Sequence, residues 1–142
     1  MKPILAFVAA CAVITACGGG GGGTSGPNPK NLSLSGVKIP TSEVVSGVQL
    51  MCSVAKQAHT DPAGSAGPFY AAPHNTMHQL VTVLHPAHRA ASDKLLNAMY
   101  VYESDIAATP PPPATGTDAD NLLQAAMEGL TALQVTPPTC PS

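Results

Sequence analysis

The side chains best suited to chemistry in this 142-residue chain are its five histidines, His59, His74, His78, His85 and His88. The last four fall within fifteen residues and include the spacings H-x-x-x-H and H-x-x-H. On a helix, at about 100° per residue, these four rings lie in a stripe roughly 80° wide, so that pairs of them can face one metal ion. Imidazole with methionine thioether nearby is typical of copper or zinc sites. One hypothesis from this pattern is a metal site at His74, His78, His85 and His88.

A purely structural role for these histidines is the main alternative. Histidines at the border of an apolar helix face are often half-buried, with one ring nitrogen in water. Pro86 interrupts the helix that the stripe assumes, and His74 precedes Thr76, the expected start of that helix. No carboxylate lies among the histidines, although Asp93 follows closely in sequence. Metal binding is thus the second hypothesis, behind a role without a cofactor.

The sequence contains none of the common catalytic motifs. It has no H-E-x-x-H, no C-x-x-C-H haem attachment site, no P-loop and no dinucleotide-binding fingerprint. The stretch GSAG at residues 64–67 lacks the glycine that a nucleophile elbow needs two positions before the serine, and no strand is predicted ahead of it. We expect this stretch to be a loop and the protein not to be an enzyme.

Apolar residues at three- and four-residue spacing predict three helical segments, which must position the histidines. The first follows Pro40, with Thr41 or Ser42 as N-cap, and ends near His59, where TDPAGSAGP supplies glycine and proline in quick succession. Its apolar face is formed by Val44, Val45, Val48, Met51, Cys52 and Ala55.

The second segment begins at Thr76 with a T-x-x-Q capping box and runs to Leu84. It then meets Pro86, where it either kinks or ends. The apolar periodicity resumes at His88 and continues to Ile106, before a run of prolines.

The third segment is capped by Thr117 or Asp118 and extends to Leu133. No segment alternates with period two over a useful length, so we expect no sheet. The predicted fold is all-α: a small antiparallel three-helix bundle, or a four-helix bundle if Pro86 breaks the second segment.

The N-terminal residues carry a targeting signal. Lys2 precedes an apolar run from Ile4 to Ile14, which is too short to span a bilayer as a helix of about 20 residues. The run ends in Ile-Thr-Ala-Cys at residues 14–17, followed by six glycines. This pattern resembles the lipobox of bacterial lipoproteins, whose cysteine receives a lipid before the signal peptide is removed. The resemblance implies a signal peptide at residues 1–16 and lipidation at Cys17.

The same resemblance implies a location. In lipoproteins of Gram-negative bacteria, an aspartate after the acylated cysteine tends to retain the protein in the inner membrane, and that position is Gly18 here. This implies a lipid anchor in the outer membrane, with the protein facing the periplasm. We expect residues 17–37 to form a flexible, glycine-rich tether and residues 38–142 to form the helical domain.

The cysteine count follows from the lipobox. With Cys11 removed in the signal peptide and Cys17 acylated, Cys52 and Cys140 are the only cysteines left in an exported chain. In an oxidising compartment we expect them to form a disulfide. That bond would hold the C-terminal tail against the first helix.

Charge and composition limit the classes of partner that the protein can bind. The chain has six Lys and Arg against eight Asp and Glu, a net charge of −2 at pH 7, so it offers no basic patch for nucleic acid. It has no Trp, and its core must be built mainly from Leu, Val, Met and Ala. We therefore expect a non-enzymatic, lipid-anchored helical protein that binds a protein partner or serves as an envelope component, with copper or zinc binding as the alternative.

Overall fold

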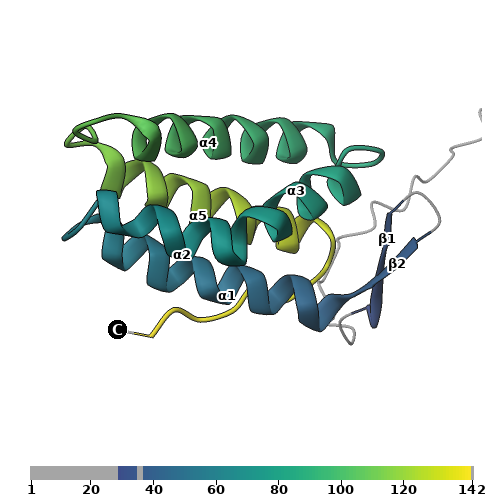
Figure 1. Ribbon diagram of the computed structural model, residues 1–142. Coiled ribbons are helices and arrows are strands. Elements are labelled where there is room, and N and C mark those ends of the chain that lie inside the picture. Colours follow the sequence, from purple (N-terminus) through teal and green to yellow (C-terminus); the bar gives the residue numbers. More distant parts are fainter. Residues whose placement is uncertain (1–28, 35–36, 142) are drawn as a thin grey trace, which may run out of the picture.

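The computed structural model of the protein describes residues 29–34 and 37–141 (Figure 1). This part of the chain is predominantly helical, as predicted. Its elements in chain order are β1 (Asn31–Leu34), β2 (Val37–Pro40), α1 (Thr41–Ala58), the short 3-10 helix η1 (Ala63–Ser65), α2 (Ala66–Ala71), α3 (Pro73–Leu84), α4 (Arg89–Ala107) and α5 (Thr115–Ala132). Within these residues, no helix combines the length and the apolar character that a membrane span requires.

The helix starts differ from those predicted. Pro73 is the first residue of α3, three residues before Thr76, so the predicted capping box is wrong and Thr76 lies buried inside the helix. Proline suits this position because its φ is already helical and the first N–H of a helix has no intrahelical partner. The earlier start makes His74 a helical residue.

The other two predicted caps are also wrong. Thr41 is the first residue of α1 rather than its cap, and its hydroxyl donates a hydrogen bond to the carbonyl oxygen of Pro29. The helix α5 begins at Thr115, whose hydroxyl donates to the carbonyl oxygen of Pro112 at 2.7 Å. In both cases the threonine side chain binds a preceding loop carbonyl instead of capping helix N–H groups.

Pro86 breaks the second predicted segment. The helix α3 ends at Leu84 and α4 begins at Arg89, so residues 85–88 form a connection between two helices. This follows from the missing N–H of proline and the clash of its ring with the preceding turn. The break turns the chain, so that α4 packs back against α3.

The expectation of a loop at residues 64–67 is wrong, because η1 and the start of α2 occupy this stretch. Gly64 N–H donates to Oδ1 of Asp61 at 3.0 Å, and the Ser65 hydroxyl donates to the carbonyl oxygen of Pro62 at 2.6 Å. Phe69, in the middle of α2, is fully buried. Burial of this ring stabilises a short helix that glycine and proline content alone would disfavour.

The expectation of no sheet is also wrong. The strands β1 and β2 pair antiparallel, with Leu32 opposite Ile39, and both of these side chains are buried. Each strand has only four residues, which is too short for a clear period-two pattern. Apolar and polar residues do alternate in NLSLSGVKIP on both sides of Ser35-Gly36. The sequence suggested that the tether ends at residue 37 and the domain begins at residue 38. β1 lies before that boundary, yet it contacts α3.

One continuous hydrophobic core joins the helices. The helix α5 contacts α1, α3 and α4, and α3 contacts both α1 and α4. The largest side chains in this core are fully buried, among them Tyr102, Phe69, Met51, Met77, Leu80, Leu95, Met99 and Leu122. The apolar positions of the three predicted segments therefore do face a common core.

The predicted disulfide is confirmed. Cys52 of α1 and Cys140 of the C-terminal tail are bonded, with their Cα atoms 5.5 Å apart. The tail returns along α1 (Figure 1), and Gln49 Nε2 donates a hydrogen bond to the carbonyl oxygen of Thr139 at 3.1 Å. Val135, at the start of the tail, is buried in the core. The tail is thus attached at its far end by the disulfide and at its near end by apolar burial.

Candidate metal site

Three potential metal ligands meet between α3 and α4. They are His74 and His78 of α3 and Glu103 of α4, and one ligand atom from each lies within 4.8 Å of the other two. The Nε2 atom of His74 is 3.2 Å from Nε2 of His78 and 3.0 Å from Oε1 of Glu103. Two imidazole nitrogens and one carboxylate oxygen are therefore close enough together to hold one metal ion.

The local helix geometry explains the histidine pair. Since α3 begins at Pro73, His74 and His78 are one turn apart on the same helix and lie on the same face. Their rings meet edge to face, with centroids 4.6 Å apart. Glu103 joins them because α4 packs against α3 after the break at Pro86.

The hydrogen bonding of these three groups is incomplete without a further partner. Nε2 of a neutral imidazole is either a donor or an acceptor, so a single Nε2–H of His74 cannot serve both His78 and Glu103. Oε1 of Glu103 is buried from solvent and lies at ion-pair distance, 3.0 Å, from Nε2 of His74. If the Nε2–H of His74 is directed at His78 instead, this buried oxygen lacks a donor, which costs about 1–3 kcal/mol, or more for a charged group. A bound cation would satisfy all three ligand atoms at once.

Two of the three ligand separations are close to those of a zinc site. With metal–ligand bonds of about 2.0–2.2 Å, ligand atoms around a tetrahedral ion lie roughly 3.3–3.6 Å apart. The two distances from His74 Nε2, 3.2 Å and 3.0 Å, are a few tenths of an ångström shorter, and the ligand atoms of His78 and Glu103 lie within 4.8 Å of each other. The residues thus fit a divalent ion with nitrogen and oxygen ligands.

Aromatic side chains hold His74 in place. The buried ring of Phe69 lies edge-on to His74 at a centroid distance of 5.4 Å, and the ring of Tyr70 does so at 5.1 Å. Phe69 also packs edge-on against Tyr102 at 5.0 Å, and the Tyr102 hydroxyl donates to the Ser65 hydroxyl at 2.7 Å. The unpredicted helix α2 therefore supplies the packing that orients the first ligand of the site.

The electrostatic environment of Tyr70 reflects the same cluster. Partial burial raises the pKa of the Tyr70 hydroxyl above its ordinary value, and the negative charge of Glu103 raises it further. Glu103 is the group whose charge matters here, because an anion nearby disfavours a phenolate. A cation bound at Glu103 would reduce that effect.

The structure brings together only part of the predicted histidine stripe. His85 and His88 lie in the connection between α3 and α4, beyond the end of the helix that carries His74 and His78. His59, at the end of α1, pairs instead with Asp120 of α5 at 2.8 Å. Pro86 is the cause, since it ends the helix on which all four rings would have shared a face.

Glu103 is the functional candidate that sequence reasoning missed. It stands beside the buried Tyr102 in the apolar pattern of α4, and no spacing relates it to histidines 25 and 29 positions earlier. The only available signal was an acidic residue at the edge of an otherwise apolar helix face.

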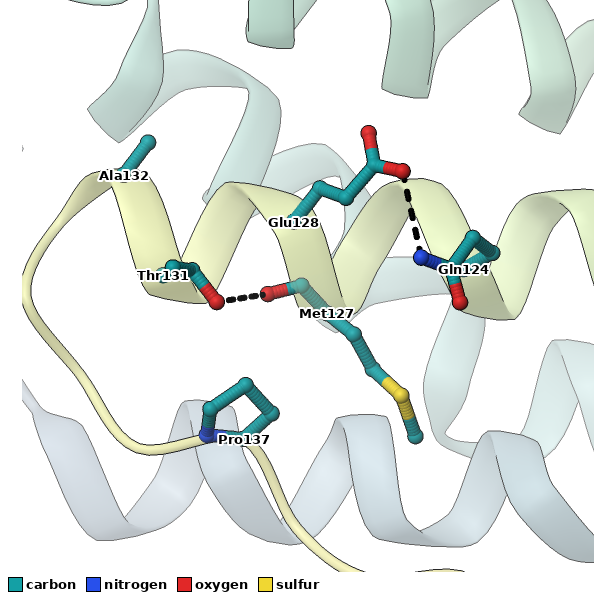
Figure 2. A pocket seen from close by; sticks show the side chains of 6 residues that line it. All are labelled: Gln124, Met127, Glu128, Thr131, Ala132 and Pro137. Carbon is teal, nitrogen blue, oxygen red and sulfur yellow. Dashed lines mark hydrogen bonds between the residues drawn. The ribbon is translucent and has the colours of Figure 1, made fainter.

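A separate hollow of about 520 Å³ lies between α5 and the C-terminal tail. Figure 2 shows Gln124, Met127, Glu128 and Thr131 along α5 with Pro137 of the tail opposite. Its one charged lining residue, Glu128, already accepts from Lys94 Nζ at 2.6 Å and from Gln124 Nε2 at 3.1 Å. This hollow therefore presents no free reactive group.

Comparison with known proteins assigns no family. No family model matches the sequence, and no curated protein or solved structure is significantly similar to it. The function has to be inferred from the site itself.

Proposed function

We propose that this protein is an exported, lipid-anchored helical lipoprotein that binds one divalent transition-metal ion at His74, His78 and Glu103, without catalysing a reaction. The convergence of these three side chains carries the proposal, because two of the three ligand atoms lie within 3.2 Å of His74 Nε2. Oε1 of Glu103 is also buried from solvent, and a carboxylate oxygen shielded from water is stabilised by a nearby cation.

The donor set favours Zn²⁺ or Cu²⁺ over Cu⁺. Imidazole suits both divalent ions, and a carboxylate is a hard anionic ligand, whereas Cu⁺ prefers thiolate and thioether sulfur. The three converging groups contain no sulfur. Met77, which precedes His78 in the sequence, is fully buried in the core.

The envelope location rests on the N-terminal sequence. The lipobox with Cys17 and Gly18 lies outside the described residues, and it favours an anchor in the outer membrane with the domain facing the periplasm. The disulfide between Cys52 and Cys140 suits such an oxidising compartment. We further infer that the helices pack as an antiparallel bundle, which the contacts of α5 with α1, α3 and α4 support.

Calorimetric titration with Zn²⁺ of protein purified without a histidine tag tests the metal site. We expect one equivalent to bind. His74→Ala and Glu103→Gln should each weaken binding at least tenfold, because each removes one of only three ligands.

His85→Ala is the matched control, since His85 is an exposed histidine beyond the end of α3. Its affinity should equal that of the wild type. Equal affinity in His74→Ala, or no stoichiometric binding to the wild type, would refute the proposed site.

A further inference from the structure

The candidate site has fewer protein ligands than the metals it suits normally take. The three ligand residues comprise the whole of the cluster found among residues 29–34 and 37–141. Zinc is normally four-coordinate, and sites with three protein ligands keep their remaining position for water or another exchangeable ligand. Closed structural sites instead use four protein ligands.

The exposure of the three ligands shows that this remaining position has access to solvent. His78 is exposed, and the His74 and Glu103 side chains are 24% and 22% exposed, although the Oε1 atom of Glu103 is itself buried. Phe69 packs on His74 from the core side and is fully buried. A cation held by the three ligands is thus covered on the core side and reachable from outside.

The charge balance favours an anion at that position. A divalent ion brings two positive charges, and Glu103 supplies one negative charge, while neutral imidazoles supply none. The loaded site therefore carries a net charge of about +1 in a partly desolvated setting, where one small anion would neutralise it.

We propose that the metal at His74, His78 and Glu103 keeps one exchangeable coordination position, which takes a small monodentate anion from solution. This inference rests on the proposed metal-binding function and extends it, because it makes the protein a binder of a second ligand through the metal. The half-exposed ring of Tyr70 lies edge-on to His74, with the ring centroids 5.1 Å apart.

Azide titration of the Cu²⁺-loaded protein tests the inference. Azide bound to Cu²⁺ gives a charge-transfer absorption band in the near ultraviolet, and we expect this band to appear and saturate with a single site. Water-proton relaxation gives a second reading. The Cu²⁺-loaded protein should enhance relaxation through solvent at the open position, and azide should reduce that enhancement.

The possible outcomes separate the two proposals. Stoichiometric Cu²⁺ binding with no azide band and no relaxation enhancement would overturn the open position while leaving the metal site intact. Failure of the wild type to bind Cu²⁺ would overturn both. The His74→Ala variant controls for copper bound elsewhere, and under the same conditions it should show no saturable azide band above that of a copper solution dialysed without protein.

Discussion

Gly47 of α1 lies directly against Thr76 of α3. A Cβ atom added to Gly47 would fall 2.1 Å from Oγ1 and 2.5 Å from Cβ of Thr76, well inside contact distance. Thr76 stands midway between His74 and His78, so this contact sets the distance of the ligand-bearing helix from α1. The absence of a side chain at Gly47 therefore determines how closely the two helices pack.

Gly47→Ala should destabilise the protein. Alanine favours helix over glycine by about 1 kcal/mol, but overpacking of a tight core contact costs about 1–3 kcal/mol, and Thr76 is β-branched and buried, with little freedom to move. We expect a lower urea midpoint for unfolding.

Gly67→Ala is the matched control for this experiment. Gly67 is an exposed residue of α2, and an added Cβ would meet nothing within 4 Å. This substitution should leave stability equal or raise it by about 0.5–1 kcal/mol. If Gly47→Ala behaves like Gly67→Ala, then α1 and α3 pack less closely than described.

Cys140→Ser should lower the free energy of unfolding by about 3–5 kcal/mol. The bond to Cys52 closes a loop with a sequence separation of 88 residues, so its loss releases much unfolded-state entropy. The helical circular dichroism should persist at low denaturant, because the apolar faces remain. Limited proteolysis should then cut after Leu133 faster than in the wild type. Equal denaturation midpoints for the oxidised protein and the variant would contradict this.

Asp105→Asn should stabilise the protein at pH 7. Burial raises the pKa of the Asp105 carboxyl, and a hydrogen bond with Asp118 and the negative charge of Asp118 raise it further. A hydrogen bond with Thr115 lowers this pKa, but the raising effects are larger. With both carboxyls ionised, Oδ2 of Asp105 is a buried atom without a hydrogen-bond donor. An asparagine would remove the repulsion and could donate its amide N–H to Asp118.

The pH dependence provides the check on Asp105. Because its folded-state pKa lies above the ordinary value of 3.8, ionisation costs stability as the pH rises from that value through the folded-state pKa. The advantage of Asp105→Asn should therefore vanish below about pH 3.8. Asp93→Asn, which alters an exposed pair with Arg89 on the same helix, should change stability by less than about 1 kcal/mol. If Asp105→Asn is more stable than the wild type by the same amount from pH 3 to pH 7, repulsion between the Asp105 and Asp118 carboxylates is not the cause.

Cys17→Ser should release the protein from membranes. A serine hydroxyl cannot form the thioether that joins the lipid to a lipobox cysteine, so the chain should remain as precursor or lose its anchor. Membrane fractionation with metabolic labelling by radioactive palmitate measures both effects. Continued palmitate incorporation in the variant would show that Cys17 is not the lipidated residue.

The sequence by itself determined the features that depend on local patterns. The apolar repeats placed α1, α4 and α5 within a few residues of their observed bounds, because a buried helix face needs side chains every three or four positions. Pro86 marked an interruption after Leu84, because proline cannot continue a helix without losing a hydrogen bond, but whether the helix kinks or ends there was settled only by the structure. The pairing of Cys52 with Cys140 followed from the count of cysteines that remain when Cys11 and Cys17 are assigned to the N-terminal segment that resembles a lipoprotein signal.

Only the tertiary structure decided the composition of the candidate site. Glu103 reaches His74 because α4 folds back on α3, and the helix α2 forms because the core accepts the ring of Phe69. The hairpin of β1 and β2 likewise depends on burying Leu32 and Ile39 against the helices. Contacts between residues far apart in the chain depend on how whole helices pack, and a local periodicity specifies which face of a helix is buried but not which neighbour covers it.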